Sequence, residues 1–240
     1  MGSMTDDEIR GASIVYAKQN KLRLARELTD PAQFAPDAHP VSVFMAGSPG
    51  AGKTEYSKVL VDIFEKNRKR HVVRIDGDAL RASFPNYTGG NSHLFQGAIS
   101  LVVEKTHDLV LHNKQNFVLD GTFSSFEKAA DNVRRSLAKG RHIFIFYLYQ
   151  KPEVAWRFTQ AREAAEGRNI PKDAFIKQYI DAQETVGRIK TEFGDAVTVF
   201  LVKKDFEFNT VEDVVEITAA EQIDTVVPER YSKEDLHKRL

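Results

Sequence analysis

The stretch Gly47-Ser48-Pro49-Gly50-Ala51-Gly52-Lys53-Thr54 decides the fold, because it meets the pattern G-x-x-x-x-G-K-[ST] of a phosphate-binding loop. Glycines at these positions let backbone N–H groups point into one concavity, and the helix that follows adds its positive N-terminal end. In such loops the lysine reaches the β- and γ-phosphates, and the hydroxyl after it binds Mg²⁺. The eight residues are therefore predicted to bind ATP, with Lys53 on the phosphates and Thr54 on Mg²⁺.

Apolar runs and helical patterns alternate on both sides of this loop. The run Val41–Ala46 predicts a buried strand before it, and Lys53–Asn67 predicts the helix after it. Further strands are predicted at residues 71–75, 116–119, 142–149 and 196–202, and further helices at residues 92–113, 126–139, 152–166 and 172–193. Strands that alternate with helices imply right-handed crossovers and a parallel sheet. The predicted fold is therefore the three-layer α/β fold of a P-loop NTPase, with a central, mostly parallel five-stranded sheet.

The two ends of the chain are predicted to add helices to this core. Thr5–Leu28 predicts an amphipathic helix with Thr5 as its N-cap, and the proline-containing residues 29–40 predict a linker. Val211–Ala220 and Lys233–Leu240 predict two short helices. We expect three parts: residues 1–40, with a vector-derived start, the helix and the linker; a P-loop domain at residues 41–205; and a helical extension at residues 206–240, packed on that domain.

The overall composition excludes several classes of protein. A chain of 240 residues with 42% hydrophobic residues suits one α/β domain with extensions. Lys plus Arg equals Asp plus Glu at 34 each, which argues against a dedicated nucleic-acid binder. There is no cysteine, so disulfides and thiolate metal sites are excluded. No apolar run reaches the length of a membrane span and the start lacks a signal-peptide pattern, so we expect a cytoplasmic protein without a membrane partner.

An acid closes the third predicted strand. Asp120 ends the apolar run Phe117–Asp120. An acid in this position is the usual partner of a phosphate-binding loop, where it holds Mg²⁺ directly or through water. The alternative is structural, since aspartate also starts turns. With the loop present, Asp120 is predicted to act with Thr54 on the metal ion.

Two more acids, Asp76 and Asp78, follow the second predicted strand. Ligands of open α/β sheets bind beyond the carboxyl ends of the strands, so these acids are expected close to the phosphates. A carboxylate there could accept the proton from an attacking hydroxyl group. The alternative for each is a helix N-cap or a turn, and the pattern leaves that alternative open.

Other charged residues suit either a site or a solvated surface. Arg162 and Arg168 flank a short charged segment, from which they could close over the phosphates and exclude water. Glu104 lies on the long helix at residues 92–113, where spacing alone favours a solvent-facing position. The histidines show no ligand spacing and are predicted to be structural: His93, His107, His112 and His142.

In this order, the motifs resemble the zeta-toxin family of bacterial kinases. The resemblance runs from about Val41 to Val202, most of the chain. The segments that carry it are the loop at 47–54, Ile75–Arg81 with Pro85 and Tyr87, Glu104, Leu119–Thr122, and Arg162 and Arg168 with Pro171. The loop alone is widespread, whereas Asp-Gly-Asp followed by Asp-Gly-Thr and two arginines is far more selective. The resemblance implies a fold similar to nucleoside monophosphate kinases.

The resemblance also implies an activity and a partner. The best-known members phosphorylate the 3′-hydroxyl of the amino sugar in UDP-N-acetylglucosamine and are held inactive by a small helical epsilon antitoxin. An ATP- and Mg²⁺-dependent phosphotransferase with a UDP-sugar acceptor and an antitoxin partner is therefore implied. By motif, Asp78 resembles the general base, and Lys53, Arg162 and Arg168 resemble the phosphate clamp. The predicted substrate contacts are Asp76, Arg81, Glu104, Asp120 and Thr122.

Two departures from the family pattern keep other functions open. The family often has a glutamate where this chain has Asp120, and the stretch between Arg162 and Arg168 is shorter than in the best-known toxins. Both changes reshape the acceptor side. The alternatives are a kinase for a nucleoside, a dinucleotide, an antibiotic hydroxyl or a polynucleotide end, an interaction module that binds ATP without transfer, and an NTPase switch.

Overall fold

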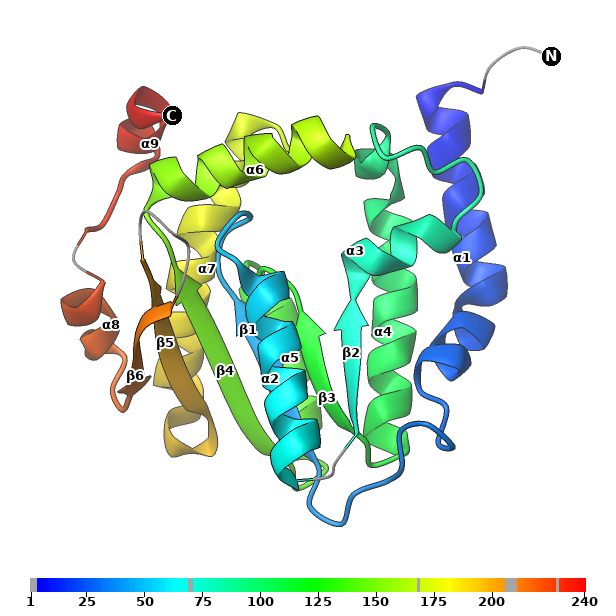
Figure 1. The fold of residues 1–240 in the computed structure, drawn as a ribbon, viewed down its shortest axis with the longest axis horizontal. Helices are drawn as coiled ribbons and strands as arrows, with labels where there is room; N and C mark the ends of the chain where they lie inside the picture. The colour runs from blue at the N-terminus through cyan, green and yellow to red at the C-terminus, as the bar shows by residue number, and fades with distance from the viewer. Residues whose placement is uncertain (1–3, 69–70, 168, 206–210, 228) are drawn as a thin grey trace.

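The computed structural model describes residues 4–68, 71–167, 169–205, 211–227 and 229–240, and its centre is one sheet of strands between helices (Figure 1). The strand order is β2-β3-β1-β4-β5-β6. The strands are β1 (Val41–Ala46), β2 (Val72–Asp76), β3 (Asn116–Asp120), β4 (His142–Tyr149), β5 (Thr198–Lys204) and β6 (Val211–Ile217). The first five run parallel, and β6 pairs antiparallel with β5. The predicted α/β fold with a mostly parallel sheet is confirmed, with six strands in place of five.

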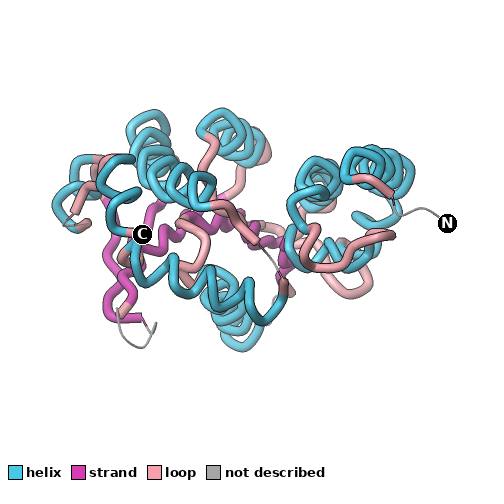
Figure 2. The backbone as a smooth tube through the Cα atoms, turned by 90° about the horizontal axis from the view of Figure 1, so that it is seen from above, coloured by secondary structure: helices cyan, strands magenta, loops and turns pink. Residues whose placement is uncertain are grey.

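Helices lie on both faces of the sheet, as the view from above shows (Figure 2). The α-helices are α1 (Asp6–Leu28), α2 (Lys53–Arg68), α3 (Gly77–Leu80), α4 (Gln96–His112), α5 (Phe126–Leu137), α6 (Pro152–Glu166), α7 (Lys172–Phe193), α8 (Glu221–Val226) and α9 (Lys233–Arg239). Helix α2 lies in front of the sheet in Figure 1, α5 and α7 lie behind it, and α6 crosses above the carboxyl ends of the strands. None of the helices within the described residues is long and apolar enough to span a membrane.

The central strands are apolar along their whole length because both faces are covered. Every residue of β1 is buried. Phe44 packs with Phe117 and Ile145 in the larger core on one face, and Val43 packs with Val118 in a smaller core on the other face. The phosphate-binding loop is thus anchored to a strand that is buried along its whole length.

The N-terminal helix α1 packs along α4 at the β2 side of the sheet (Figure 1). Thr5 caps α1 as predicted: its hydroxyl accepts a hydrogen bond from the Glu8 N–H, and the Glu8 carboxylate accepts one from the Thr5 N–H at 2.7 Å. Ala17 and Leu24 of α1 share a buried cluster with Val102 of α4. Helix α1 therefore supports the helix that carries Glu104.

The prediction of a helix at Val211–Ala220 was wrong, because residues 211–217 form the edge strand β6. Val202 pairs with Val214 and Val199 with Ile217 along β5. Three valines and an isoleucine favour an extended strand, and the unpaired edge of β5 supplies its hydrogen bonds. Helix α8, which was not predicted, follows the strand, whereas the predicted helix at the C-terminus is confirmed as α9.

Candidate active site

The phosphate-binding loop has the backbone shape that its glycines predict. Gly47, Gly50 and Gly52 all have positive φ angles, of 135°, 75° and 82°. A Cβ at Gly50 would lie 2.0 Å from the carbonyl oxygen of Ala155, so no larger residue fits against α6. Gly47 N–H donates to the Thr122 carbonyl at 3.1 Å, which ties the loop to the end of β3. The loop fits phosphate because its shape leaves a concavity at the N-terminus of α2.

Lys53 is the cation of this loop. Its ammonium group donates to the Ser48 carbonyl at 2.6 Å. The pKa of Lys53 is lowered to about 8, chiefly by burial and also by the charge of Arg162, while Asp120 and Asp78 oppose the shift. The nearby acids therefore offset only part of the cost of burying the positive charge of Lys53. Phosphate oxygens would restore its ordinary protonation, which is what a nucleotide site requires.

Thr54 and Asp120 provide oxygen ligands suited to Mg²⁺. Thr54 is in the first turn of α2, and Asp120 is the last residue of β3, with a side chain only 5% exposed. No described residue donates a hydrogen bond to Oδ1 of Asp120, although Oδ2 accepts several. The described residues hold no cluster of three His, Asp or Glu arranged for a metal ion. The donor set fits Mg²⁺ bound through a hydroxyl, a carboxylate, phosphates and water.

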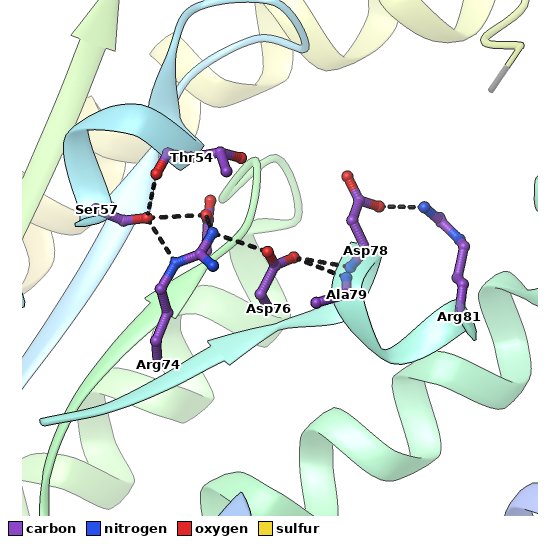
Figure 3. A network of polar contacts seen from close by, with 8 residues as sticks. Thr54, Ser57, Arg74, Asp76, Asp78, Ala79 and Arg81 are labelled. Atoms are coloured by element: carbon purple, nitrogen blue, oxygen red, sulfur yellow. Dashed lines mark hydrogen bonds and ion pairs between the residues drawn. The ribbon is translucent and has the colours of Figure 1, made fainter. Parts of the chain in front are cut away.

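Figure 3 shows a polar network around Arg74 that sequence reasoning missed and that includes Asp120. Arg74 of β2 donates through Nη2 to Oδ2 of Asp120 at 2.6 Å and to Oδ2 of Asp76 at 2.8 Å. Its Nε donates to the Ser57 hydroxyl at 2.9 Å, and that hydroxyl lies 3.0 Å from Oδ2 of Asp120 and 2.9 Å from the Thr54 carbonyl. In the sequence, the one sign of this role was a charged residue between apolar residues of a predicted strand.

Asp76 and Asp78 lie at the carboxyl end of β2 in different roles. Asp76 is the N-cap of α3, since its Oδ1 accepts from the N–H groups of Asp78 at 2.8 Å and Ala79 at 3.4 Å. Asp78 forms an ion pair with Arg81, one turn later. Arg81 also donates to Gln96 at 3.1 Å. Asp76 thus has the capping role left open by the sequence, in which its carboxylate binds the backbone N–H of Asp78.

A cavity of about 960 Å³ joins these residues into one site. It is near the upper end of the usual range for small-molecule sites. The predicted site residues on its wall are Pro49, Gly50, Gly52, Lys53, Thr54, Asp76, Asp78, Arg81, Glu104, Asp120, Thr122 and Arg162. The predicted loop residues Gly47, Ser48 and Ala51 do not line it. Arg168 lies outside the described residues. The wall thus combines the loop with side chains from β2, β3, α4 and α6.

The far wall of the cavity is formed by α4 and α5. Glu104 is exposed and faces this cavity, so its solvent-facing position is also a site position. Thr122 hydrogen bonds through its hydroxyl to Ser124 at 2.9 Å. Asn132 and Arg135 of α5 extend the wall and were not singled out from the sequence. A polar wall of this kind suits an acceptor with several hydroxyl or amide groups.

His107 of α4 is buried in the aromatic core and borders the same cavity. Its ring packs edge-on against Phe117 at a centroid distance of 5.1 Å. Burial lowers its pKa to about 3, with smaller contributions from the charges of Arg135 and Arg141. Within the described part of the chain neither ring nitrogen completes a hydrogen bond; nearby Asn132 only weakly opposes the pKa shift. The structural role predicted for this histidine fits a neutral imidazole in the core.

A glycine-rich loop between a central parallel strand and a helix, with an acid ending the neighbouring strand, defines a P-loop protein of the α/β class. The profile of the zeta-toxin family, described as "Zeta toxin", matches residues 25–216. The match covers most of the chain and includes the loop, β2, β3 and α6. The chain belongs to the zeta-toxin family.

Similar proteins carry related names. "Toxin PezT" of Streptococcus pneumoniae serotype 4 (strain ATCC BAA-334 / TIGR4) is 22% identical over 130 residues, which cover 51% of this chain and 50% of that protein. The chain thus matches about half the length of this curated relative. The name of this relative, a toxin, agrees with the family assignment.

Solved structures share the fold across nearly the whole chain. A structure of the PezAT chromosomal toxin–antitoxin system of S. pneumoniae has a TM-score of 0.69 at 17% identity, covering 97% of this chain and 98% of its own. The native AvrRxo1-ORF1:-ORF2 complex has a TM-score of 0.57 at 13% identity, covering 92% and 73%. The AvrRxo1-ORF1:-ORF2 structure with ATP has a TM-score of 0.54 at 12% identity, covering 87% and 65%. These likenesses show the fold.

Proposed function

We propose that this protein is an ATP-dependent kinase that phosphorylates a hydroxyl group of a small molecule. The observation that carries the proposal is the shared cavity, in which Lys53 of the phosphate-binding loop and Asp78 line one continuous space. A donor site and a carboxylate base on the same cavity are the two parts that phosphoryl transfer requires. Family membership and the ATP present in one structural neighbour support the same reaction.

In the proposed mechanism the acceptor oxygen attacks the γ-phosphorus in line. The new bond joins that oxygen to phosphorus, the bond to the β,γ-bridging oxygen breaks, and ADP leaves with the electron pair. Asp78 accepts the proton of the acceptor hydroxyl. Arg81 stabilises the charged form of Asp78, which suits a base that takes its proton late, as loose phosphoryl-transfer transition states allow.

Positive charge around the phosphates provides the electrostatic part of catalysis. Lys53 and Arg162 line the cavity, and Arg168 is proposed from its motif to join them. Their charges stabilise the oxygens of the transferred group in the transition state. Bound Mg²⁺ would supply further neutralisation of the phosphates, with Thr54 and Asp120 as the residues that hold it.

We propose a UDP-sugar as the acceptor, and specifically the 3′-hydroxyl of UDP-N-acetylglucosamine. Support comes from the family's motifs on the acceptor side, with Asp76, Arg81, Glu104, Asp120 and Thr122 on the cavity wall. A cavity of about 960 Å³ gives room for a second ligand beside the nucleotide. In this proposal the carboxylates of Glu104 and Asp120 and the hydroxyl of Thr122 orient the sugar.

We also propose that the protein is the toxin of a toxin–antitoxin pair, with a small helical antitoxin as its partner and the cytoplasm as its place of action. The support is family membership, a relative named as a toxin, and one structural neighbour described as a toxin–antitoxin system. Expression of the chain alone should then arrest growth of a bacterial host, and the Asp78→Ala variant should not. If the wild type and Asp78→Ala both arrest growth, the toxicity does not depend on phosphoryl transfer.

An acceptor screen tests the proposed reaction. Purified protein, Mg²⁺ and γ-labelled ATP are mixed with UDP-N-acetylglucosamine, other UDP-sugars, nucleosides, NAD, a hydroxyl-bearing antibiotic and an oligonucleotide. Label on UDP-N-acetylglucosamine is the expected result. Label on another acceptor would keep the kinase and reject the UDP-sugar, whereas hydrolysis without any labelled acceptor would favour an NTPase. Tight ATP binding without turnover would favour an interaction module.

A further inference from the structure

Arg74 is an arginine between the apolar residues Val73 and Ile75 of β2. Its neighbours Val73 and Ile75 are buried, while the Arg74 side chain reaches the carboxyl end of the sheet (Figure 3). There its Nη2 bridges Asp120 and Asp76 at 2.6 and 2.8 Å, and its Nε binds the Ser57 hydroxyl at 2.9 Å. One guanidinium therefore joins β2, β3 and the first turns of α2.

The two carboxylates that Arg74 bridges are forced close together by the fold. Asp76 and Asp120 are paired residues of the adjacent parallel strands β2 and β3. Their side chains are 12% and 5% exposed, so water screens their mutual repulsion poorly. A permanently charged arginine offsets this repulsion and has enough donors to bind both acids. Without it, the two carboxylates would turn apart.

Arg74 and Ser57 engage Oδ2 of Asp120 and restrict the side chain to one orientation. Ser57 is one turn after Thr54 on α2 and lies close to the Thr54 carbonyl, so the network links both proposed Mg²⁺ ligands. Oδ1 accepts no hydrogen bond from any described side chain or backbone group. The contacts thus hold one carboxylate oxygen and leave the other for a ligand.

We propose that Arg74 is a positioning residue, which orients the carboxylate of Asp120 for the metal ion that accompanies the nucleotide. This inference rests on the proposed function, because that function supplies the metal–nucleotide ligand. Arg74 is not among the residues that line the cavity, so it would act through Asp120. Residues that orient metal ligands typically change metal affinity by about 10- to 100-fold when they are replaced.

The test measures metal binding directly. Mn²⁺ replaces Mg²⁺ as the probe, and its binding to the full-length protein with saturating ADP is titrated by electron paramagnetic resonance. R74M removes the charge and keeps the length of the side chain. We expect about 10-fold or greater weakening of Mn²⁺ binding in R74M and a smaller loss in R74K. Mn²⁺ affinity within about twofold of the wild type in R74M would overturn the proposal.

Arg141 offers a matched control for the loss of a buried arginine. It lies at the opposite end of the strands, where it donates to the Ser42 hydroxyl and to the carbonyls of Val41 and Gln115 at 2.6–2.7 Å. R141M should lower thermal stability without changing Mn²⁺ affinity. Equal losses of Mn²⁺ affinity in R74M and R141M would make the effect of Arg74 purely structural and overturn the proposal.

A double-mutant cycle tests whether Arg74 acts through Asp120. D120N should itself weaken Mn²⁺ binding, and adding R74M to D120N should change it by less than about twofold. An R74M effect of the same size in both backgrounds would overturn the proposal. If R74M does not fold, R74K carries the test, and wild-type Mn²⁺ affinity in R74K would then count against it. If the wild-type protein transfers no phosphoryl group but R74M still weakens Mn²⁺ binding, the positioning role of Arg74 is supported and only the kinase activity is rejected.

Discussion

The two sides of the cavity are built in different ways. The phosphate side is one run of eight residues, shaped by the backbone at Gly47, Gly50 and Gly52. The acceptor side collects single side chains from β2, β3, α4 and α5. A backbone site tolerates little change and binds what all nucleotides share, whereas a wall of separate side chains can change one residue at a time. Specificity is therefore expected on the acceptor side.

A large loss of activity is predicted on the phosphate side. Lys53→Met removes the loop cation, and phosphoryl transfer should fall by about 10²–10³-fold because the charge on the transferred group loses a stabilising partner. Steady-state kinetics with the acceptor found in the screen measures this loss. Transfer within a few-fold of the wild type would mean that Lys53 does not contact the phosphates.

A smaller and more selective effect is predicted on the acceptor side. Glu104→Gln should raise the KM for the acceptor by about 10-fold or more, since a hydrogen bond to a charged group is lost. The affinity for ATP should stay the same, because Glu104 lies on α4, away from the loop. Kinetics with each substrate varied in turn distinguishes the two sides. An equal rise in the KM for ATP and for the acceptor would mean that Glu104 is not specific to the acceptor side.

Proton uptake on ATP binding tests the contact between Lys53 and the phosphates. The pKa of Lys53 is lowered from 10.5 to about 8 in the protein alone, and bound phosphates should raise it again. ATP binding should therefore take up about half a proton at pH 8, and ATP affinity should fall as the pH rises above about 8. Calorimetry in buffers of different ionisation enthalpy measures the uptake. The Lys53→Met protein should lack this uptake, and the same uptake in both proteins would contradict the assignment.

A further predicted effect concerns the stability of the fold and involves His107, behind the acceptor wall. The folded pKa of His107, about 3, is below its unfolded value of 6.5, so the unfolded chain binds one more proton between these values. The free energy of unfolding should therefore fall as the pH drops from 6.5 towards 3, by up to about 1.4 kcal/mol per pH unit. Urea unfolding measured across this pH range should give a weaker dependence of the free energy of unfolding on pH for His107→Phe than for the wild type. Identical pH dependence in the two proteins would show that folding does not lower the pKa of His107.

The sequence predicted the local parts of this structure better than the assembled ones. The loop, β1 and β4 have the predicted bounds, because apolar runs and glycine spacing depend on near neighbours along the chain. Strand β6 was predicted as a helix, since its extended form depends on pairing with β5. Arg74 and Ser57 were missed for the same reason: their partner Asp120 is 46 and 63 residues away.

The predicted acceptor residues depended on resemblance rather than on spacing. Helical position alone gave Glu104 a solvent face, and the structure shows that this face borders the cavity. Asp76 could be a cap or a site residue from its pattern, and it caps α3 while lining the same cavity. Local patterns therefore identify the phosphate side, while the acceptor wall becomes visible only once α4 and α5 are packed on the sheet.

The central claim, that Asp78 completes a kinase site opposite the phosphate-binding loop, has one direct test. Single-turnover transfer from γ-labelled ATP to UDP-N-acetylglucosamine is compared between the wild type and Asp78→Ala, with ATP affinity measured on the same preparations. We predict a loss of transfer of about 10²–10⁴-fold in Asp78→Ala, with ATP affinity within about twofold of the wild type. Near-wild-type transfer by Asp78→Ala would contradict the account.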